Sequence, residues 1–63
     1  MRLKQARLGR AAGTVVYLYD GYDYGLTRDD ELATGRPHTA VTEDADRGGP
    51  FFTVPIDELE GTE

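Results

Sequence analysis

Residues 14–21 read Thr-Val-Val-Tyr-Leu-Tyr-Asp-Gly, a run that is β-branched or aromatic at five of its first six positions. Such side chains are typical of strands, while Gly13 before the run and the Asp-Gly pair that ends it favour turns. Side chains alternate between the faces of a strand, so Val16 and Leu18 point to one face and their neighbours to the other. Both faces are apolar. The run therefore predicts a central, largely covered strand over residues 14–19.

Further elements are predicted downstream of this strand. Ala40 or Val41 is expected to face the core from a Thr-rich strand, and Pro55 can begin a helical turn because its φ is already set. Ile56 and Leu59 are three residues apart, which puts them on one side of such a turn. The predicted elements are a strand over 38–43, a turn over 44–49, a strand over 51–54, and a single 3₁₀ or α turn over 55–60.

The middle of the chain allows two interpretations at each of two places. Residues 22–26 alternate again after the Asp-Gly turn signal, which fits a tight hairpin or a loop held by its aromatic side chains. Residues 27–37 are polar and end in Gly-Arg-Pro, which favours a surface loop. The alternative is one helical turn that begins at Thr27, has acidic residues in its first turn and stops at Gly35.

Short strands separated by long polar loops and closed by a helical turn indicate a mainly β fold. Residues 8–16, Leu-Gly-Arg-Ala-Ala-Gly-Thr-Val-Val, resemble the opening of SH3-like and KOW-type modules. Residues 52–59, Phe-Thr-Val-Pro-Ile-Asp-Glu-Leu, are similar to the last strand and short helical turn of small SH3-like proteins. The resemblance implies a small SH3-like barrel or rolled antiparallel sheet of four to five short strands with a C-terminal 3₁₀ turn.

The functions of those families are not expected to carry over. One SH3-like family, the plasmid-type dihydrofolate reductases, uses an active-site motif of Gln, Ile and Tyr on a strand, and this sequence lacks it. KOW modules are basic, whereas most of this chain is acidic. Neither reductase activity nor RNA binding is therefore implied by the resemblance.

The chain has 63 residues and no cysteine, so we expect a single small domain over residues 1–63 without disulfides or thiolate metal sites. Its charge is uneven. Residues 1–10 carry four bases and no acid, a net +4, whereas residues 11–63 carry three bases against twelve acids, a net −9. Residues 1–10 are predicted to form a basic arm or an edge strand, and residues 61–63 a frayed tail.

No apolar run is long enough to cross a bilayer, and no apolar segment of the kind found in secretory signals follows the basic N-terminus. We therefore expect a cytoplasmic protein. His38 is the one histidine, the residue type whose unperturbed pKa lies near neutral pH, and it has no obvious catalytic partner in the sequence. Residues 44–49 resemble the start of a calcium-binding loop but lack part of its oxygen ligands. The adjacent carboxylates of residues 29–31 would point in different directions in an extended chain and would not converge on a metal ion. No catalytic, cofactor-binding or metal-binding residue is assigned, and an enzyme is not expected.

All four tyrosines lie within eight residues and are interleaved with acidic side chains. Tyrosine offers a large, rigid contact area with a polar tip and is enriched in interfaces. The alternative is that these rings form the core, because the chain has only two Phe and no Trp. The interface hypothesis assigns partner binding to Tyr17, Tyr19, Tyr22, Asp23, Tyr24, Asp29 and Asp30.

The sequence thus predicts a non-enzymatic protein-interaction module that uses a Tyr-rich acidic face and can associate with itself. One alternative is a small acidic inhibitor or nucleic-acid mimic of the kind found in phage and mobile elements, because carboxylates can occupy a basic groove. Another is nucleic-acid binding through the basic arm, which the acidic remainder of the chain disfavours. No membrane partner and no small-molecule substrate are predicted.

Overall fold

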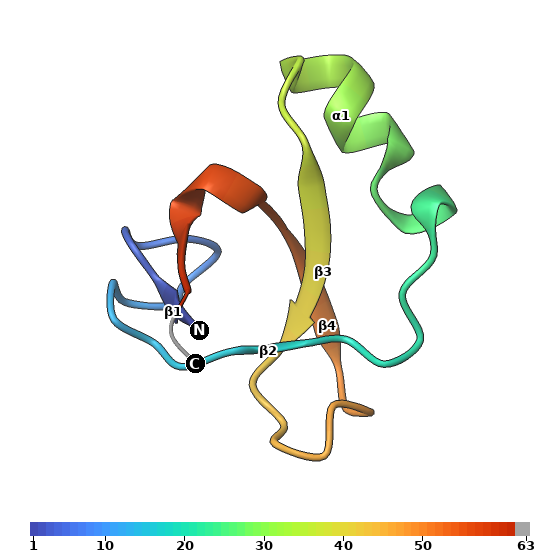
Figure 1. The fold of residues 1–63 in the computed structure, drawn as a ribbon. Coiled ribbons are helices and arrows are strands. Elements are labelled where there is room, and N and C mark those ends of the chain that lie inside the picture. The colour runs from blue at the N-terminus through green and yellow to red at the C-terminus, as the bar shows by residue number, and fades with distance from the viewer. Residues whose placement is uncertain (62–63) are drawn as a thin grey trace.

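Five short strands form two antiparallel sheets in the computed structural model, which describes residues 1–61 (Figure 1). The strands are β1 (Arg2–Leu3), β2 (Tyr17–Leu18), β3 (His38–Thr42), β4 (Phe51–Pro55) and β5 (Leu59–Glu60). The helical elements are the 3₁₀ helices η1 (Tyr24–Leu26) and η2 (Ile56–Glu58) and the α-helix α1 (Arg28–Thr34). The prediction of a mainly β fold with four to five short strands and a C-terminal 3₁₀ turn is confirmed. Residues 62 and 63 of the predicted tail lie outside the described residues.

The hairpin of β3 and β4 is the longest regular element, and both of its strands were predicted. Its register runs from His38 opposite Pro55 to Thr42 opposite Phe51, and residues 43–50, which include the turn predicted over 44–49, connect the two strands. β3 is the middle strand of the sheet β2-β3-β4, so both of its edges are paired with neighbouring strands. Ala40 and Val41 point to opposite faces of the sheet and are both fully buried, so both faces of β3 are covered at this point.

The core is small and lies between the two sheets. Five buried side chains form it, and Met1 and Leu59 pack against its rim as partly buried side chains. Burial of one such aliphatic or aromatic side chain contributes about 1.5–3 kcal/mol. The core residues are Leu3, Val16, Val41, Phe52 and Val54. A core of this size is expected for a chain this short, and each of its members matters for stability.

The predicted SH3-like barrel is not closed. β1 pairs with β5 in one sheet and β2, β3 and β4 make the other, while a single bridge between Arg2 and Val15 joins the first sheet to the chain leading into β2. Three of the five strands are only two residues long. Strands of this length give too few ladder hydrogen bonds to carry a sheet around a complete barrel.

The long central strand predicted over residues 14–19 is wrong in length and in position. Only Tyr17 and Leu18 form β2, which is an edge strand. The run changes its hydrogen-bonding partner within a few residues. Val16 pairs with Met1, the residue before β1, whereas the Tyr19 N–H donates to the Ala40 carbonyl of β3. Val16 is buried but Leu18 is about half exposed. The choice of partner depends on tertiary structure, which the local pattern does not contain.

The surface loop predicted over residues 27–37 is also wrong, and the helical alternative is confirmed. Three acidic side chains occupy the first turn of α1, where the helix dipole favours them. The helix ends at Gly35, which has a left-handed φ of 71° and donates its N–H to the Glu31 carbonyl. Thr27 precedes the helix without capping it through its side chain. Residues 22–26 form no hairpin, because η1 begins at Tyr24. Asp23 is the N-cap of η1, and its side chain accepts a hydrogen bond from the Gly25 N–H.

Candidate functional site

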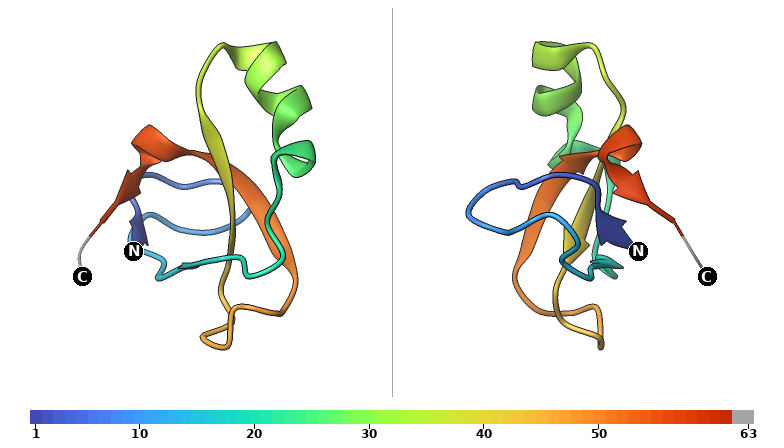
Figure 2. Two further views of the ribbon diagram at one scale, coloured as in Figure 1. Left: turned by 45° about the vertical axis from the view of Figure 1, so that its right-hand side comes forward. Right: turned by 90° about the vertical axis from the view of Figure 1, so that its left-hand side faces the viewer.

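The helical unit of η1 and α1 projects from one end of the molecule. Figures 1 and 2 place it away from β1, β5 and the N-terminus. The two helices pack on one another, and neither contains a buried residue. Leu32 of α1 is 71 % exposed and Tyr24 of η1 is 58 % exposed. A helix in a globular domain normally buries an apolar stripe, so α1 is unusual in presenting its leucine to solvent.

Polar contacts hold this unit on the sheet. Asp30 accepts a hydrogen bond of 2.8 Å from the Thr53 hydroxyl of β4, and the Glu31 carboxylate accepts one of 2.9 Å from the backbone N–H of His38. That N–H lies on the side of β3 that faces β2, beyond the end of β2, so the carboxylate takes the place of a strand carbonyl. Two adjacent acidic residues therefore fasten α1 to β3 and β4.

An open groove of about 330 Å³ lies along the helical unit. Its lining combines an aromatic ring, an exposed leucine, a proline, one carboxylate and one guanidinium group. The lining residues are Tyr24, Glu31, Leu32, Gly35, Arg36 and Pro37. Because the Arg36 guanidinium binds Asp57 and Glu58, its charge is already compensated within the molecule. The groove therefore offers apolar contact area beside net negative charge.

The structure brings five of the seven predicted partner-binding residues onto this unit. Tyr22 is 38 % exposed and its hydroxyl lies 3.0 Å from the Thr27 hydroxyl, while Tyr24 is more exposed. Asp23 is exposed and caps η1. Asp29 and Asp30 lie in the first turn of α1, Asp29 exposed and Asp30 partly buried by its bond to β4. We call Tyr22, Asp23, Tyr24, Asp29, Asp30 and Leu32 the η1–α1 face.

Tyr17 and Tyr19 do not lie on this unit. Both are partly buried at β2, and the Tyr19 ring stacks on Phe51 at the start of β4, with 4.6 Å between the ring centroids. The chain reverses directly after Tyr19, and the ring covers Gly21. A Cβ at Gly21 would lie 3.0 Å from Tyr19 Cε2, so a larger residue there would make the ring shift by a few tenths of an ångström. Tyr19 therefore serves packing between strands.

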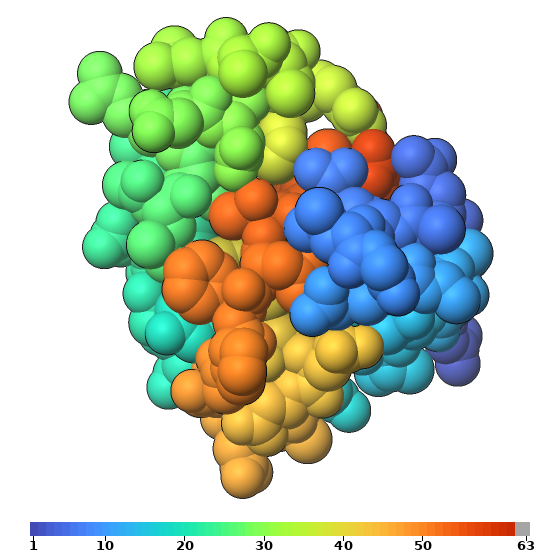
Figure 3. Space-filling view, turned by 180° about the vertical axis from the view of Figure 1, so that it is seen from behind, coloured from blue at the N-terminus to red at the C-terminus, as the bar shows by residue number. Residues whose placement is uncertain are grey.

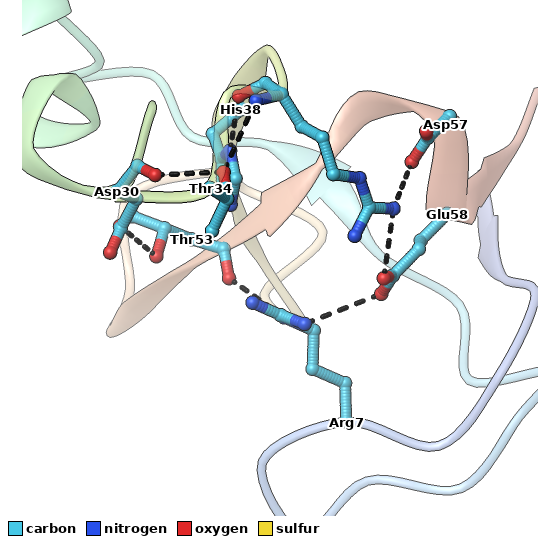
Figure 4. A network of polar contacts seen from close by, with 8 residues as sticks. Arg7, Asp30, Thr34, His38, Thr53, Asp57 and Glu58 are labelled. Carbon is cyan, nitrogen blue, oxygen red and sulfur yellow. Dashed lines mark hydrogen bonds and ion pairs between the residues drawn. The ribbon is translucent and has the colours of Figure 1, made fainter. Parts of the chain in front are cut away.

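A second cluster of polar side chains surrounds Glu58, the buried last residue of η2 (Figure 4). Its carboxylate lies 3.4 Å from an Arg7 guanidinium nitrogen and 3.2 Å from one of Arg36. Arg7 also donates to the Thr53 carbonyl of β4, and Arg36 reaches Asp57. A nearly buried carboxylate is costly unless paired, and here two cations compensate it.

The hydrogen bond from Arg36 holds the pKa of the Asp57 carboxyl below its ordinary value, and the same bond raises the pKa of Arg36. Both groups are exposed, so the pair is well screened by water.

His38 is buried, and its Nδ1–H donates to the Arg36 carbonyl over 2.8 Å. Because a carbonyl can only accept, Nδ1 is the donor in this contact.

The basic N-terminal segment lies against the sheets. The Arg10 guanidinium sits 4.0 Å above the centre of the Phe52 ring and 3.3 Å from a Glu43 oxygen. Figure 3 shows this segment, in blue, beside the orange β4 strand. Of the four basic side chains in residues 1–10, Arg7 and Arg10 therefore make contacts within the protein, Arg7 through its bond to Glu58. Arg2 and Lys4 are exposed.

Sequence reasoning missed the part of the candidate site that depends on α1. Leu32, Arg36 and Pro37 border the groove, but the sequence favours a loop over residues 27–37. The acidic first turn and the glycine at position 35 support the helical alternative, yet they give no sign that Leu32, Arg36 and Pro37 share a groove. The buried Glu58 gave no signal, since a lone glutamate in a polar turn is usually exposed.

Within residues 1–61, no group of three or more His, Asp or Glu side chains is arranged to hold a metal ion. The same described part of the chain contains no helix that is long and apolar enough to cross a membrane. Comparisons of the chain with protein families, with curated proteins and with solved structures found no match.

Proposed function

We propose that this protein is a non-enzymatic interaction module that binds a protein partner through the η1–α1 face. The observation that carries the proposal is that α1 contains no fully buried residue and exposes Leu32 in the same groove as the exposed ring of Tyr24. Exposed aromatic and aliphatic side chains that share a groove are typical of interaction sites, whereas isolated ones are common on any surface.

The charge of the face indicates the chemistry of the partner. Asp23 and Asp29 are exposed, and the two carboxylates next to Asp29 along α1 add further negative charge. Arg28 is the one base on α1. A partner segment that carries Lys or Arg next to an apolar side chain would match both features of the groove. Such a segment could place its apolar side chain between Tyr24 and Leu32.

The test is affinity capture from the native cell with the immobilised protein, followed by mass spectrometry and a binding measurement on the recovered partner. Tyr24→Ala and Leu32→Ala are each expected to weaken binding about tenfold, equivalent to about 1.4 kcal/mol. Leu8→Ala is the matched control, because Leu8 is also exposed, at 62 %, but lies in the N-terminal segment.

Equal capture by all three variants would contradict the proposal, provided that each retains the melting temperature of the wild type. A recovered nucleic-acid-binding protein that added duplex DNA displaces would instead favour the acidic-mimic alternative. In that case binding should fall steeply with salt and respond more to Asp29→Asn than to Leu32→Ala.

A further inference from the structure

The turn that follows β2 places an aspartate directly before a glycine at the surface. Of the seven aspartates in the chain, only Asp20 precedes a glycine. Asp20 and Gly21 occupy the middle of the turn, which is closed by a hydrogen bond of 3.2 Å from the Tyr22 N–H to the Tyr19 carbonyl. Both residues are exposed, and the Asp20 side chain is 72 % exposed. Along the chain, the pair lies between the sheet and the helical unit (Figure 1).

The Gly21 nitrogen and the Asp20 Cγ are not held by other groups. Within residues 1–61, no group accepts a hydrogen bond from the Gly21 N–H. Asp20 is held through other atoms, because its N–H donates to the Arg47 carbonyl over 2.8 Å and its Oδ1 lies 3.6 Å from the Arg47 guanidinium group. An exposed ion pair of this length restrains a carboxylate only weakly. Glycine also has no Cβ to obstruct the approach of the preceding side chain to its nitrogen.

The other six aspartates lack this combination. Each of them precedes a residue that has a side chain, and four have a carboxylate oxygen in a hydrogen bond. These four are Asp23, Asp30, Asp44 and Asp57. Of the remaining two, Asp29 lies within α1, and Asp46 precedes Arg47, whose N–H donates to the Asp44 carbonyl. Asp20 is therefore the aspartate whose surroundings least restrain a reaction with the next amide.

We propose that Asp20 and Gly21 form a site of spontaneous covalent modification, at which Asp20 isomerises to isoaspartate through a cyclic imide. The reaction needs no enzyme and no reagent other than water. The site lies outside the η1–α1 face, so the proposal does not depend on the proposed function.

The reaction has two steps, and its atoms balance. In the first, the Gly21 nitrogen attacks Cγ of the protonated Asp20 carboxyl group. The N–Cγ bond forms, the bond from Cγ to the hydroxyl oxygen breaks, and the hydroxyl leaves as water with the amide proton. In the second step, water adds to one of the two ring carbonyls. Opening at the side-chain carbonyl restores aspartate, and opening at the main-chain carbonyl gives isoaspartate.

The product changes the turn itself. In isoaspartate the main chain runs through the side-chain carbonyl, so the backbone between Tyr19 and Tyr22 gains one carbon atom. Tyr19 stacks on Phe51 of β4, and the Tyr22 hydroxyl lies 3.0 Å from the Thr27 hydroxyl just before α1. The modification is therefore expected to disturb the hydrogen bond that closes the turn, at the connection between the sheet and the helical unit.

The experiment keeps the folded full chain at neutral pH in heavy-oxygen water for several weeks and then maps its peptides by mass spectrometry. Each passage through the cyclic imide adds one oxygen atom from water to residue 20, whether aspartate or isoaspartate results. The expected result is heavy oxygen in Asp20, together with a second form of the same peptide that separates on reversed-phase chromatography. The other six aspartates are internal controls and should take up far less label.

Asp20→Glu should abolish the labelling at residue 20, because the longer side chain would have to close a six-membered ring. Gly21→Ala should slow it several-fold, because its Cβ obstructs the approach of the carboxyl group. Far-UV circular dichroism checks that this variant is folded, since the Cβ would lie 3.0 Å from Tyr19 Cε2. Asp46→Glu is the matched control, because Asp46 is also exposed in a loop, and residue 20 should then label at the wild-type rate.

Urea distinguishes a reaction in the folded turn from one in the unfolded chain. Below the unfolding transition, the labelling rate of Asp20 should change little. A reaction that requires global unfolding would instead accelerate in step with the unfolding equilibrium, and that result overturns the proposal. So does a folded chain in which Asp20 takes up no more label than the other aspartates, or a rate that Asp20→Glu leaves unchanged.

Discussion

The β3–β4 hairpin and the helical unit of η1 and α1 use similar numbers of residues in opposite ways. The hairpin buries Val41, Phe52 and Val54 in the core, whereas neither helix buries any residue. The hairpin is held by a five-residue ladder and apolar burial, and the helical unit by hydrogen bonds from Asp30 and Glu31. In this small protein one region supplies the apolar core, and the other leaves its side chains exposed to solvent.

The largest expected effect comes from the hairpin. Phe52→Ala removes a buried ring and the surface on which Arg10 lies, and large-to-small core changes of this kind cost about 3–5 kcal/mol. That is comparable with the whole stability expected of a small domain, so the variant should be largely unfolded at 25 °C. Urea denaturation followed by circular dichroism measures this.

The neighbouring Phe51→Ala is the matched control. Phe51 faces the other side of β4, is 41 % exposed and contributes mainly its stack with Tyr19. It should cost about 1 kcal/mol, the value typical of an aromatic pair. Equal destabilisation by the two variants would show that the core does not lie where the hairpin places it.

A smaller loss of stability is expected when the negative charge of Glu58, in the 3₁₀ helix that follows the hairpin, is removed. Glu58→Gln leaves Arg7 and Arg36 without their shared carboxylate, and should lower the free energy of unfolding by about 1–2 kcal/mol. The loss stays below that of a fully buried pair because both arginines remain partly exposed to water. Glu60→Gln, at an exposed position on β5, is expected to change the urea midpoint little; an equal effect would refute the role given to Glu58.

Truncation on the helical unit should have almost no effect on folding. Leu32→Ala replaces one good helix former by another at a position that is 71 % exposed, so stability should stay within about 0.5 kcal/mol of the wild type. Thermal unfolding by circular dichroism checks this. A marked drop in melting temperature would mean that Leu32 packs against the sheet, and the contrast between the two regions would be lost.

The smallest expected effect is a dependence on pH at Asp57. Its pKa is lowered in the folded state by the hydrogen bond from Arg36, so folding favours the ionised carboxylate. The resulting stability is present above the unfolded pKa of about 4 and disappears as the pH falls through the lower folded value. Urea midpoints should therefore drop slightly more for the wild type than for Asp57→Asn between pH 6 and pH 3. Parallel curves would contradict this assignment.

The sequence predicted the parts of the fold that local signals determine. The β3–β4 hairpin has β-branched or aromatic strands on both sides of a turn rich in Gly and Asp, and the 3₁₀ turn begins after a proline. The extent of β2 was not predictable, because residues 14–16 pair with β1 whereas β2 pairs with β3. For α1, seven residues are too few for a periodic apolar pattern, and acidic residues are equally typical of loops.

The same limit applies to the candidate site. The local concentration of tyrosine and aspartate identified Tyr22, Asp23 and Tyr24. These residues follow one another in the sequence, so they are also close together in the structure. The groove beside Tyr24 was not predictable, because it requires α1 and the chain after Gly35 to fold back together. The different placement of Tyr19 has the same origin, since its stack on Phe51 joins residues that are 32 positions apart.

Native-state hydrogen exchange of the free protein tests this contrast most directly. It shows whether the β3–β4 hairpin is the stable part of the protein while the helical unit opens locally. The account predicts that the amides of Val41 and Phe52, within the hairpin, exchange only through global unfolding. The amides in the last turn of α1 should exchange through local opening that requires much less free energy. Protection of α1 equal to that of β3 and β4 would contradict the account, because the helix would then belong to the same cooperative unit as the core.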